Sequence, residues 1–164
     1  MRLPPEETAR RAAAAMWAED HASQALGMRI VEVAPGRATL EMTVRPDMVN
    51  GHGIGHGGLT FSLADSAFAF ACNSHNRRTV ARACEITYLA PTHLGDELTA
   101  TAVERERRGR DGTYDVTVRS PTGVVAEFVG RSREIRGTLF PEDQPPPGPP
   151  PRHDHDEQEE NRWD

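Results

Sequence analysis

The feature that most constrains this 164-residue chain is the apolar stretch at residues 57–73, GGLTFSLADSAFAFACN. It contains no proline and is apolar nearly all round, a pattern typical of a helix that is buried on most sides. It is also shorter than the roughly 20 residues of a membrane-spanning helix. The rest of the chain is therefore expected to wrap around this helix and bury it.

The segments on either side indicate what forms the wrapping. An alanine-rich segment at residues 6–22 follows Pro4 and Pro5 and predicts a helix. Six strand-like runs, several with clear alternation of apolar and polar residues, lie at residues 28–33, 38–44, 80–89, 96–107, 113–120 and 124–135. This order predicts an α+β fold in which a long central helix is wrapped by a curved antiparallel sheet, with an additional N-terminal helix.

The charge of the chain is concentrated at its C-terminal end. The net charge is −6, yet residues 141–164 hold eight acidic and two basic residues, so residues 1–140 are neutral. We expect residues 1–140 to form one domain and the proline-rich, acidic residues 141–164 to be a disordered tail. His153 and His155 could bind a metal, although a solvated tail is the simpler interpretation. A neutral domain argues against nucleic-acid binding, which needs a basic face.

Two further observations concern the cellular compartment. The N-terminal sequence MRLPPEETARR lacks the apolar core of a secretory signal, and no apolar run is long enough to span a membrane. Cys72 and Cys84 lie in apolar stretches, and we interpret them as free thiols rather than a disulfide framework. We therefore predict a cytoplasmic protein.

The chemistry is expected between Asn50 and Asp65, in the sequence NGHGIGHGGLTFSLAD. The first N–H groups of the central helix follow Gly57 and Gly58, and helix N-termini present unpaired donors and a partial positive charge. Because glycine lets a ligand approach the backbone, such a site can bind a phosphate or polarise a carbonyl. The alternative interpretation is a plain turn and helix cap.

Asp65 stands out because it is an acidic residue inside the most apolar helix. An ionised carboxylate in apolar surroundings needs partners or a raised pKa, and such residues cluster at functional sites. The alternative is an Asp that is hydrogen-bonded to Ser62 or Ser66, or that faces a solvent seam. We interpret Asp65 as a functional acid.

The spacing of Gly57 and Asp65 predicts how they cooperate. Eight residues of helix separate them by roughly 12 Å at 1.5 Å per residue, whereas a reacting carbonyl must lie about 3 Å from both its donor and its attacker. One helix cannot easily supply both groups to one carbon. If both act on one substrate, two antiparallel helices must face each other in a dimer with interfacial active sites.

Other chemistries are less favoured. His52, His56 and Asp65 could bind a metal, but the glycine-rich loop gives no helical scaffold to align them, so we expect no metal. His56, at the helix start, is interpreted as a neutral hydrogen-bonding group. Cys72 lacks the surroundings of a nucleophile, and the sequence has no GxSxG motif or P-loop.

The stretch NGHGIGHGGLTFSLADSAFAFACNSH resembles the signature of the PaaI-type hotdog-fold thioesterases, the hydroxyphenylacetyl-CoA thioesterases of phenylacetate degradation. The resemblance runs from about Met16 to Ile135 and includes ACEITYLAPTHLGDELTATA. It implies the hotdog fold, hydrolysis of aryl-acetyl-CoA to free acid and CoA, and no cofactor. It also implies homodimers with residues paired across subunits, commonly assembled into homotetramers.

The resemblance also implies roles for individual residues. Asp65 corresponds to the catalytic acid, acting as general base or nucleophile, and the Gly57 N–H to the donor that polarises the thioester carbonyl. Asn50 corresponds to a residue that holds the water or substrate. His56, with Gly58 beside it, is expected at the substrate. Some relatives place a Ser on the strand after the helix, where this chain has Ala81, Arg82 and Ala83.

Two alternatives from other classes remain. One is a hotdog enoyl-CoA hydratase or dehydratase with His56 as base and Asp65 as acid, and the other is a non-catalytic acyl-CoA-binding protein. The phosphates of a CoA substrate are expected to meet arginines at the surface, and the candidates are Arg77, Arg78 and the arginines at 107, 108 and 110, although a solvated side chain is the simpler interpretation of each.

Overall fold

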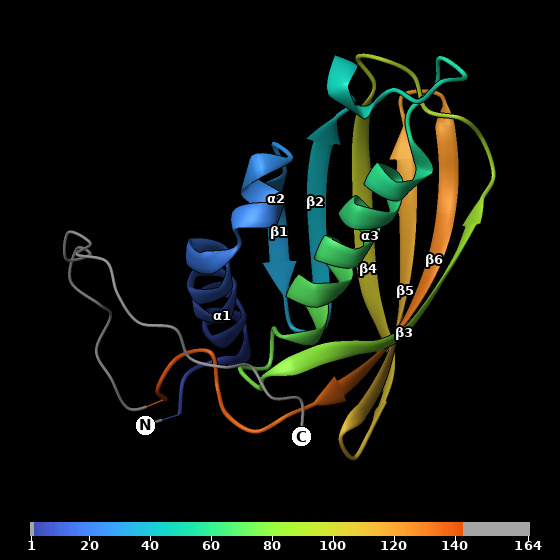
Figure 1. The fold of residues 1–164 in the computed structure, drawn as a ribbon. Coiled ribbons are helices and arrows are strands. Elements are labelled where there is room, and N and C mark those ends of the chain that lie inside the picture. Colours follow the sequence, from blue (N-terminus) through green and yellow to red (C-terminus); the bar gives the residue numbers. More distant parts are fainter. Residues whose placement is uncertain (1, 143–164) are drawn as a thin grey trace.

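A computed structural model describes residues 2–142 of the chain. A helix of 15 residues and one of five come first, and a third helix, of 16 residues, divides the strands into a group of two and a group of four (Figure 1). The elements are α1 Pro5–Glu19, α2 His21–Ala25, β1 Arg29–Ala34, β2 Arg37–Thr43, the 3-10 helix Pro46–Met48, α3 Gly57–Cys72, β3 Thr79–Tyr88, β4 Glu97–Arg108, β5 Asp111–Ser120 and β6 Gly123–Glu134. The predicted α+β class is confirmed.

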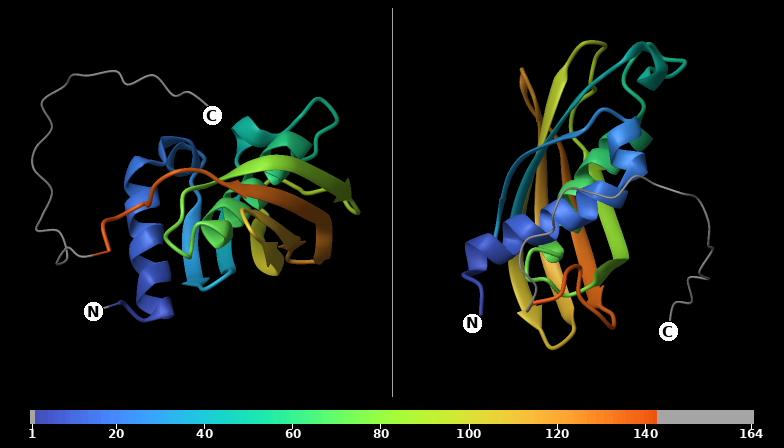
Figure 2. Two further views of the ribbon diagram at one scale, coloured as in Figure 1. Left: turned by 90° about the horizontal axis from the view of Figure 1, so that it is seen from below. Right: turned by 90° about the vertical axis from the view of Figure 1, so that its left-hand side faces the viewer.

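The strands form one antiparallel sheet in the order β1-β2-β4-β5-β6-β3. The sheet curves around α3, with α1 and α2 beside α3 and β1 (Figure 2). Register shifts in four of the five strand pairs mark bulges or irregularities, which increase local twist and help a sheet to curl. The wrapping predicted from the central apolar stretch is therefore present.

The core forms where the inner face of the sheet meets α3. Alternate residues of β5 are buried, and Tyr114, Val116 and Val118 are at most 1% exposed, as the two-residue period of a strand requires. On α3, Phe68 packs against the Tyr114 and Phe128 rings. Phe68 also lies so close to β6 that a Cβ on Gly130 would be 2.7 Å from its ring. The close approach of α3 to the sheet therefore depends on this glycine.

The N-terminal helix ends earlier than the sequence predicts. The helix expected over residues 6–22 ends at Glu19, and a separate helix, α2, begins at His21. Asp20 divides them because its carboxylate accepts hydrogen bonds from the Ser23 N–H at 2.9 Å and the Ser23 hydroxyl at 2.7 Å. This is the N-cap arrangement that starts a new helix.

The last described residues are attached to the domain by Asn76. This side chain is fully buried, donates to the Phe140 carbonyl at 3.0 Å, and accepts from the N–H groups of Leu139 and Phe140. The tail expected at residues 141–164, with His153 and His155, lies outside the described residues apart from positions 141 and 142. The domain boundary after Phe140 stays a prediction. No helix within residues 2–142 is long and apolar enough to cross a membrane.

Candidate active site

The end of the loop that precedes α3 is held by two backbone hydrogen bonds. The His56 N–H donates to the Met48 carbonyl at 2.7 Å, and the Gly55 N–H donates to the Thr92 carbonyl at 2.8 Å. Inside the loop, Asn50 Oδ1 accepts from the N–H groups of His52 and Ile54, at 2.9 and 3.4 Å. These bonds fix the point at which α3 begins.

The first turn of α3 leaves one donor open. His56 is the N-cap, and its Nδ1 accepts from the Gly58 N–H at 2.9 Å. Nδ1 therefore acts as an acceptor, which is consistent with the predicted neutral ring. The Gly57 N–H has no hydrogen-bond partner among residues 2–142. Gly57 thus presents a donor at the positive end of the helix dipole, the arrangement that polarises a carbonyl oxygen.

Tyr88, at the end of β3, packs against this donor. Its hydroxyl donates to the Gly57 carbonyl at 2.8 Å, and a Cβ on Gly57 would be only 3.0 Å from its ring. A cavity of about 480 Å³ opens beside Gly57, with Asn50, Thr60, Tyr88 and Leu89 in its lining. Its size lies within the 300–1,000 Å³ typical of small-molecule sites.

Asp65 lies in the middle of α3 and faces β3. The Cys84 thiol donates to Asp65 Oδ1 at 3.8 Å. The two serines that could have bound Asp65 have other partners, since Ser62 donates to the Gly58 carbonyl and Ser66 pairs with Ser23. Burial raises the pKa of Asp65, and the thiol hydrogen bond partly opposes this rise. A carboxyl with a raised pKa in such a position can exchange a proton with a substrate or water.

The predicted site residues thus fall into two places on one chain. Asn50, His56, Gly57 and Gly58 lie together at the start of α3, whereas Asp65 is eight residues further along and does not line the cavity beside Gly57. The Gly58 N–H is taken up by His56. Within residues 2–142, no group of three or more His, Cys, Asp and Glu side chains is placed to hold a metal ion.

Two residues of this region, Cys84 and Tyr88, were not predicted to take part. Both come from β3, where alternate residues share a face, so Cys84, Ile86 and Tyr88 point the same way. From this alternation one could have predicted that all three side chains face α3. Arg82, on the same strand, instead forms an ion pair with Asp111 at 3.2 Å. Cys84 is therefore the β3 residue whose side chain makes a polar contact with Asp65.

Both cysteines are free thiols. Burial raises the pKa of Cys72 to about 12 and that of Cys84 to about 11, with the negative charge of Asp65 contributing in each case. Neither thiol is therefore ionised near neutral pH. The expectation that Cys72 is not a nucleophile agrees with this environment.

Comparisons with known proteins identify the family to which the chain belongs. Residues 52–127 match the family model described as Thioesterase superfamily. Acyl-coenzyme A thioesterase PaaI of Escherichia coli strain K12 is 46% identical over 126 residues, which cover 76% of this chain and 90% of that protein. Human acyl-coenzyme A thioesterase 13 is 37% identical over 75 residues, which cover 44% of this chain and 54% of that protein.

Solved structures agree with these matches. The structure of the E. coli PaaI protein from the phenylacetic acid degradation operon superposes with a TM-score of 0.80 at 43% identity, covering 82% of this chain and 99% of that chain. The TT0310 protein of Thermus thermophilus gives a TM-score of 0.67 at 40% identity, covering 69% and 96%. The chain therefore belongs to the thioesterase superfamily, and its fold is the hotdog fold. Within the superfamily it is of the PaaI type, and it is a thioester hydrolase.

Proposed function

We propose that this thioester hydrolase cleaves acyl-CoA, with aryl-acetyl-CoA thioesters of the hydroxyphenylacetyl type as its substrates, in phenylacetate degradation. The observation that carries the reaction type is the Gly57 N–H at the start of α3, which has no hydrogen-bond partner in the described part of the chain and lies beside a cavity of about 480 Å³. The name of the E. coli relative supports acyl-CoA. The operon named for its structure supports the pathway.

Each of the proposed site residues has a separate role in the hydrolysis. The Gly57 N–H donates to the thioester carbonyl oxygen and stabilises the negative charge that develops on it. Asp65 either takes a proton from the attacking water or attacks the carbonyl carbon itself. The carbon–sulfur bond then breaks, and the CoA thiolate leaves and is protonated. In the second route water hydrolyses the acyl–Asp65 anhydride. Asn50, which lines the cavity, holds the water or substrate, and His56 lies beside the donor at the helix start.

The two groups come from different subunits in this proposal. Within one helix about 12 Å separates them, too far for both to contact one carbonyl. The outer edge of β3 pairs with no strand in the described part of the chain, and such an edge offers backbone groups to a second copy. A homodimer with antiparallel α3 helices would bring Gly57 of one subunit to Asp65 of the other. Two such dimers would form the proposed homotetramer.

A thiol-release assay over several acyl-CoAs tests the proposal. The panel contains phenylacetyl-CoA, hydroxyphenylacetyl-CoA, benzoyl-CoA and straight-chain acyl-CoAs, and we expect the highest kcat/KM for the two aryl-acetyl substrates. A preference for straight chains would overturn the substrate class. Water addition to a 2-enoyl-CoA without thiol release would show a hydratase instead, and binding without turnover would show a non-catalytic acyl-CoA-binding protein.

A further inference from the structure

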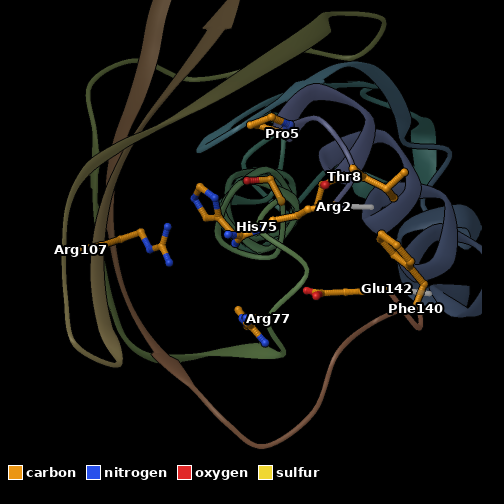
Figure 3. A pocket seen from close by; sticks show the side chains of 10 residues that line it. Arg2, Pro5, Thr8, His75, Arg77, Arg107, Phe140 and Glu142 are labelled. Carbon is orange, nitrogen blue, oxygen red and sulfur yellow. The ribbon is translucent and has the colours of Figure 1, made fainter.

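A second cavity, of about 660 Å³, lies at the end of α3 opposite to Gly57 (Figure 3). It is bordered by the residues around the start of α1, the turn after α3, the end of β4 and the last described residues. None of the residues assigned to thioester hydrolysis lines it. Its volume would accommodate a ligand the size of a nucleotide.

Three arginines border this cavity. Arg107 lies on one side of the opening, Arg2 on the other, and Arg77 between them (Figure 3). Neither the Arg2 nor the Arg77 side chain makes a hydrogen bond or ion pair with the described residues. The guanidinium groups of Arg2 and Arg77 therefore border one cavity, and neither forms an ion pair with a described acidic residue.

The acidic residue beside Arg107 is already compensated. Glu104 Oε1 accepts from the buried Tyr114 hydroxyl at 2.8 Å, lies 3.0 Å from His75 Nε2, and lies 3.7 Å from Arg107 Nε. Because a carboxylate only accepts hydrogen bonds, His75 Nε2 carries a proton. Glu104 thereby fixes the His75 ring at the cavity wall, and its own charge is shared among three donors.

Glu142 is the acidic residue among those that line the cavity. Figure 3 shows its side chain directed toward the space between His75 and Arg77. It makes no ion pair within 4.0 Å with the described residues. The three arginines that line the cavity outnumber this one carboxylate.

From these observations we propose that the cavity binds a phosphate group. Guanidinium groups pair with phosphate oxygens through charge-assisted hydrogen bonds, and Arg2, Arg77 and Arg107 bring such groups to the cavity from three segments of the chain. Two sources could deliver that group, the nucleotide end of a CoA thioester or a separate phosphorylated metabolite. Assigning the CoA end rests on the proposed function, whereas phosphate binding itself does not.

Thermal unfolding with inorganic phosphate tests the binding. We expect phosphate to raise the Tm of the wild type by about 2 °C or more relative to chloride at equal ionic strength. The double variant Arg77→Gln/Arg107→Gln should lose this rise. Arg119→Gln is the matched control, because Arg119 is exposed and pairs with Thr99 at the other end of the β4–β5 ladder.

The outcomes are distinct. A Tm rise in the wild type and in Arg119→Gln, but not in the double variant, supports the proposal. No rise in the wild type, or an equal rise in all three proteins, overturns it. Because phosphate binding is measured without acyl-CoA, failure here would leave the thioesterase proposal unaffected.

Steady-state kinetics then separates the two sources. If the nucleotide end of CoA occupies the cavity, the double variant raises KM for acyl-CoA by about tenfold and leaves KM for the matching acyl-pantetheine unchanged. If KM is unchanged for both while the phosphate effect on Tm is lost, a separate phosphorylated ligand occupies it. Failure of the wild type to hydrolyse any thioester would instead count against the proposed function.

Discussion

Asp65 combines a polar group with apolar surroundings, and its chemistry depends on one neighbouring element. Burial raises its pKa, and the Cys84 thiol on β3 is its hydrogen-bond donor. The sequence revealed Asp65 because a carboxylate within an apolar helix is unusual. It could not reveal Cys84 as the donor, because that contact joins residues 19 apart through the packing of α3 against β3.

Asp65→Asn should remove activity without removing the fold. We expect kcat to fall by about 10²–10⁴-fold, the usual contribution of a general base, with an unchanged circular dichroism spectrum. Turnover near that of the wild type would contradict the assignment of Asp65.

The same variant makes a prediction about stability. Because burial raises the pKa of Asp65, ionising it in the folded state costs stability, and that cost appears as pH rises from the ordinary value through the raised pKa. The Tm of Asp65→Asn relative to wild type should therefore rise with pH across this window. Tm curves that run parallel at all pH values would contradict the raised pKa.

Cys84→Ala tests the role of the thiol. The thiol hydrogen bond favours the carboxylate and lowers the pKa of Asp65, so its removal should raise that pKa further. The acidic limb of the kcat/KM profile should move to higher pH in Cys84→Ala, whereas Cys84→Ser, which keeps a donor, should stay near or below the wild type. Identical pH profiles for wild type and Cys84→Ala would show that the thiol has no influence on the pKa of Asp65.

At the scale of elements, the central helix and its contact with the sheet determine where the site lies. The predicted ends of α3 and of the six strands lie within two residues of those in the structure, because alternation and turn residues are local signals. The strand order β2-β4 and β6-β3 was not predictable in the same way. Those pairings join segments far apart in the chain, and no local pattern records them.

Gly130→Ala tests the contact between α3 and β6. Its new Cβ would lie 2.7 Å from the Phe68 ring, and relieving that overlap should lower the free energy of unfolding by about 1–3 kcal/mol. Gly51→Ala is the control, since a Cβ there meets no atom within 4 Å. Chemical denaturation measures both, and an unchanged stability for Gly130→Ala would contradict this packing.

At the scale of the whole molecule, the domain is expected to end at Phe140. The buried Asn76 side chain holds the backbone of Leu139 and Phe140, so a chain truncated after Phe140 keeps these contacts. We expect that truncated chain to retain wild-type kcat and Tm in the thiol-release and unfolding assays. A large loss of either would place the domain boundary further along.

The central claim is that two subunits build each active site, and complementation between inactive variants tests it most directly. Gly57→Pro removes the donor N–H at a helix position that accepts proline, and His56 before it already has the extended backbone that proline requires, with φ −66° and ψ 128°. Gly57→Ala keeps the N–H and controls for the contact with Tyr88. Asp65→Ala removes the acid.

Each variant alone, Gly57→Pro or Asp65→Ala, should be inactive. A purified hybrid dimer of the two holds one site with both changes and one intact site, so it should recover about half of the wild-type turnover. Thioester hydrolysis by that hybrid dimer is the decisive measurement. Recovery confirms an active site shared between subunits, and a hybrid that stays as inactive as its parents would contradict it.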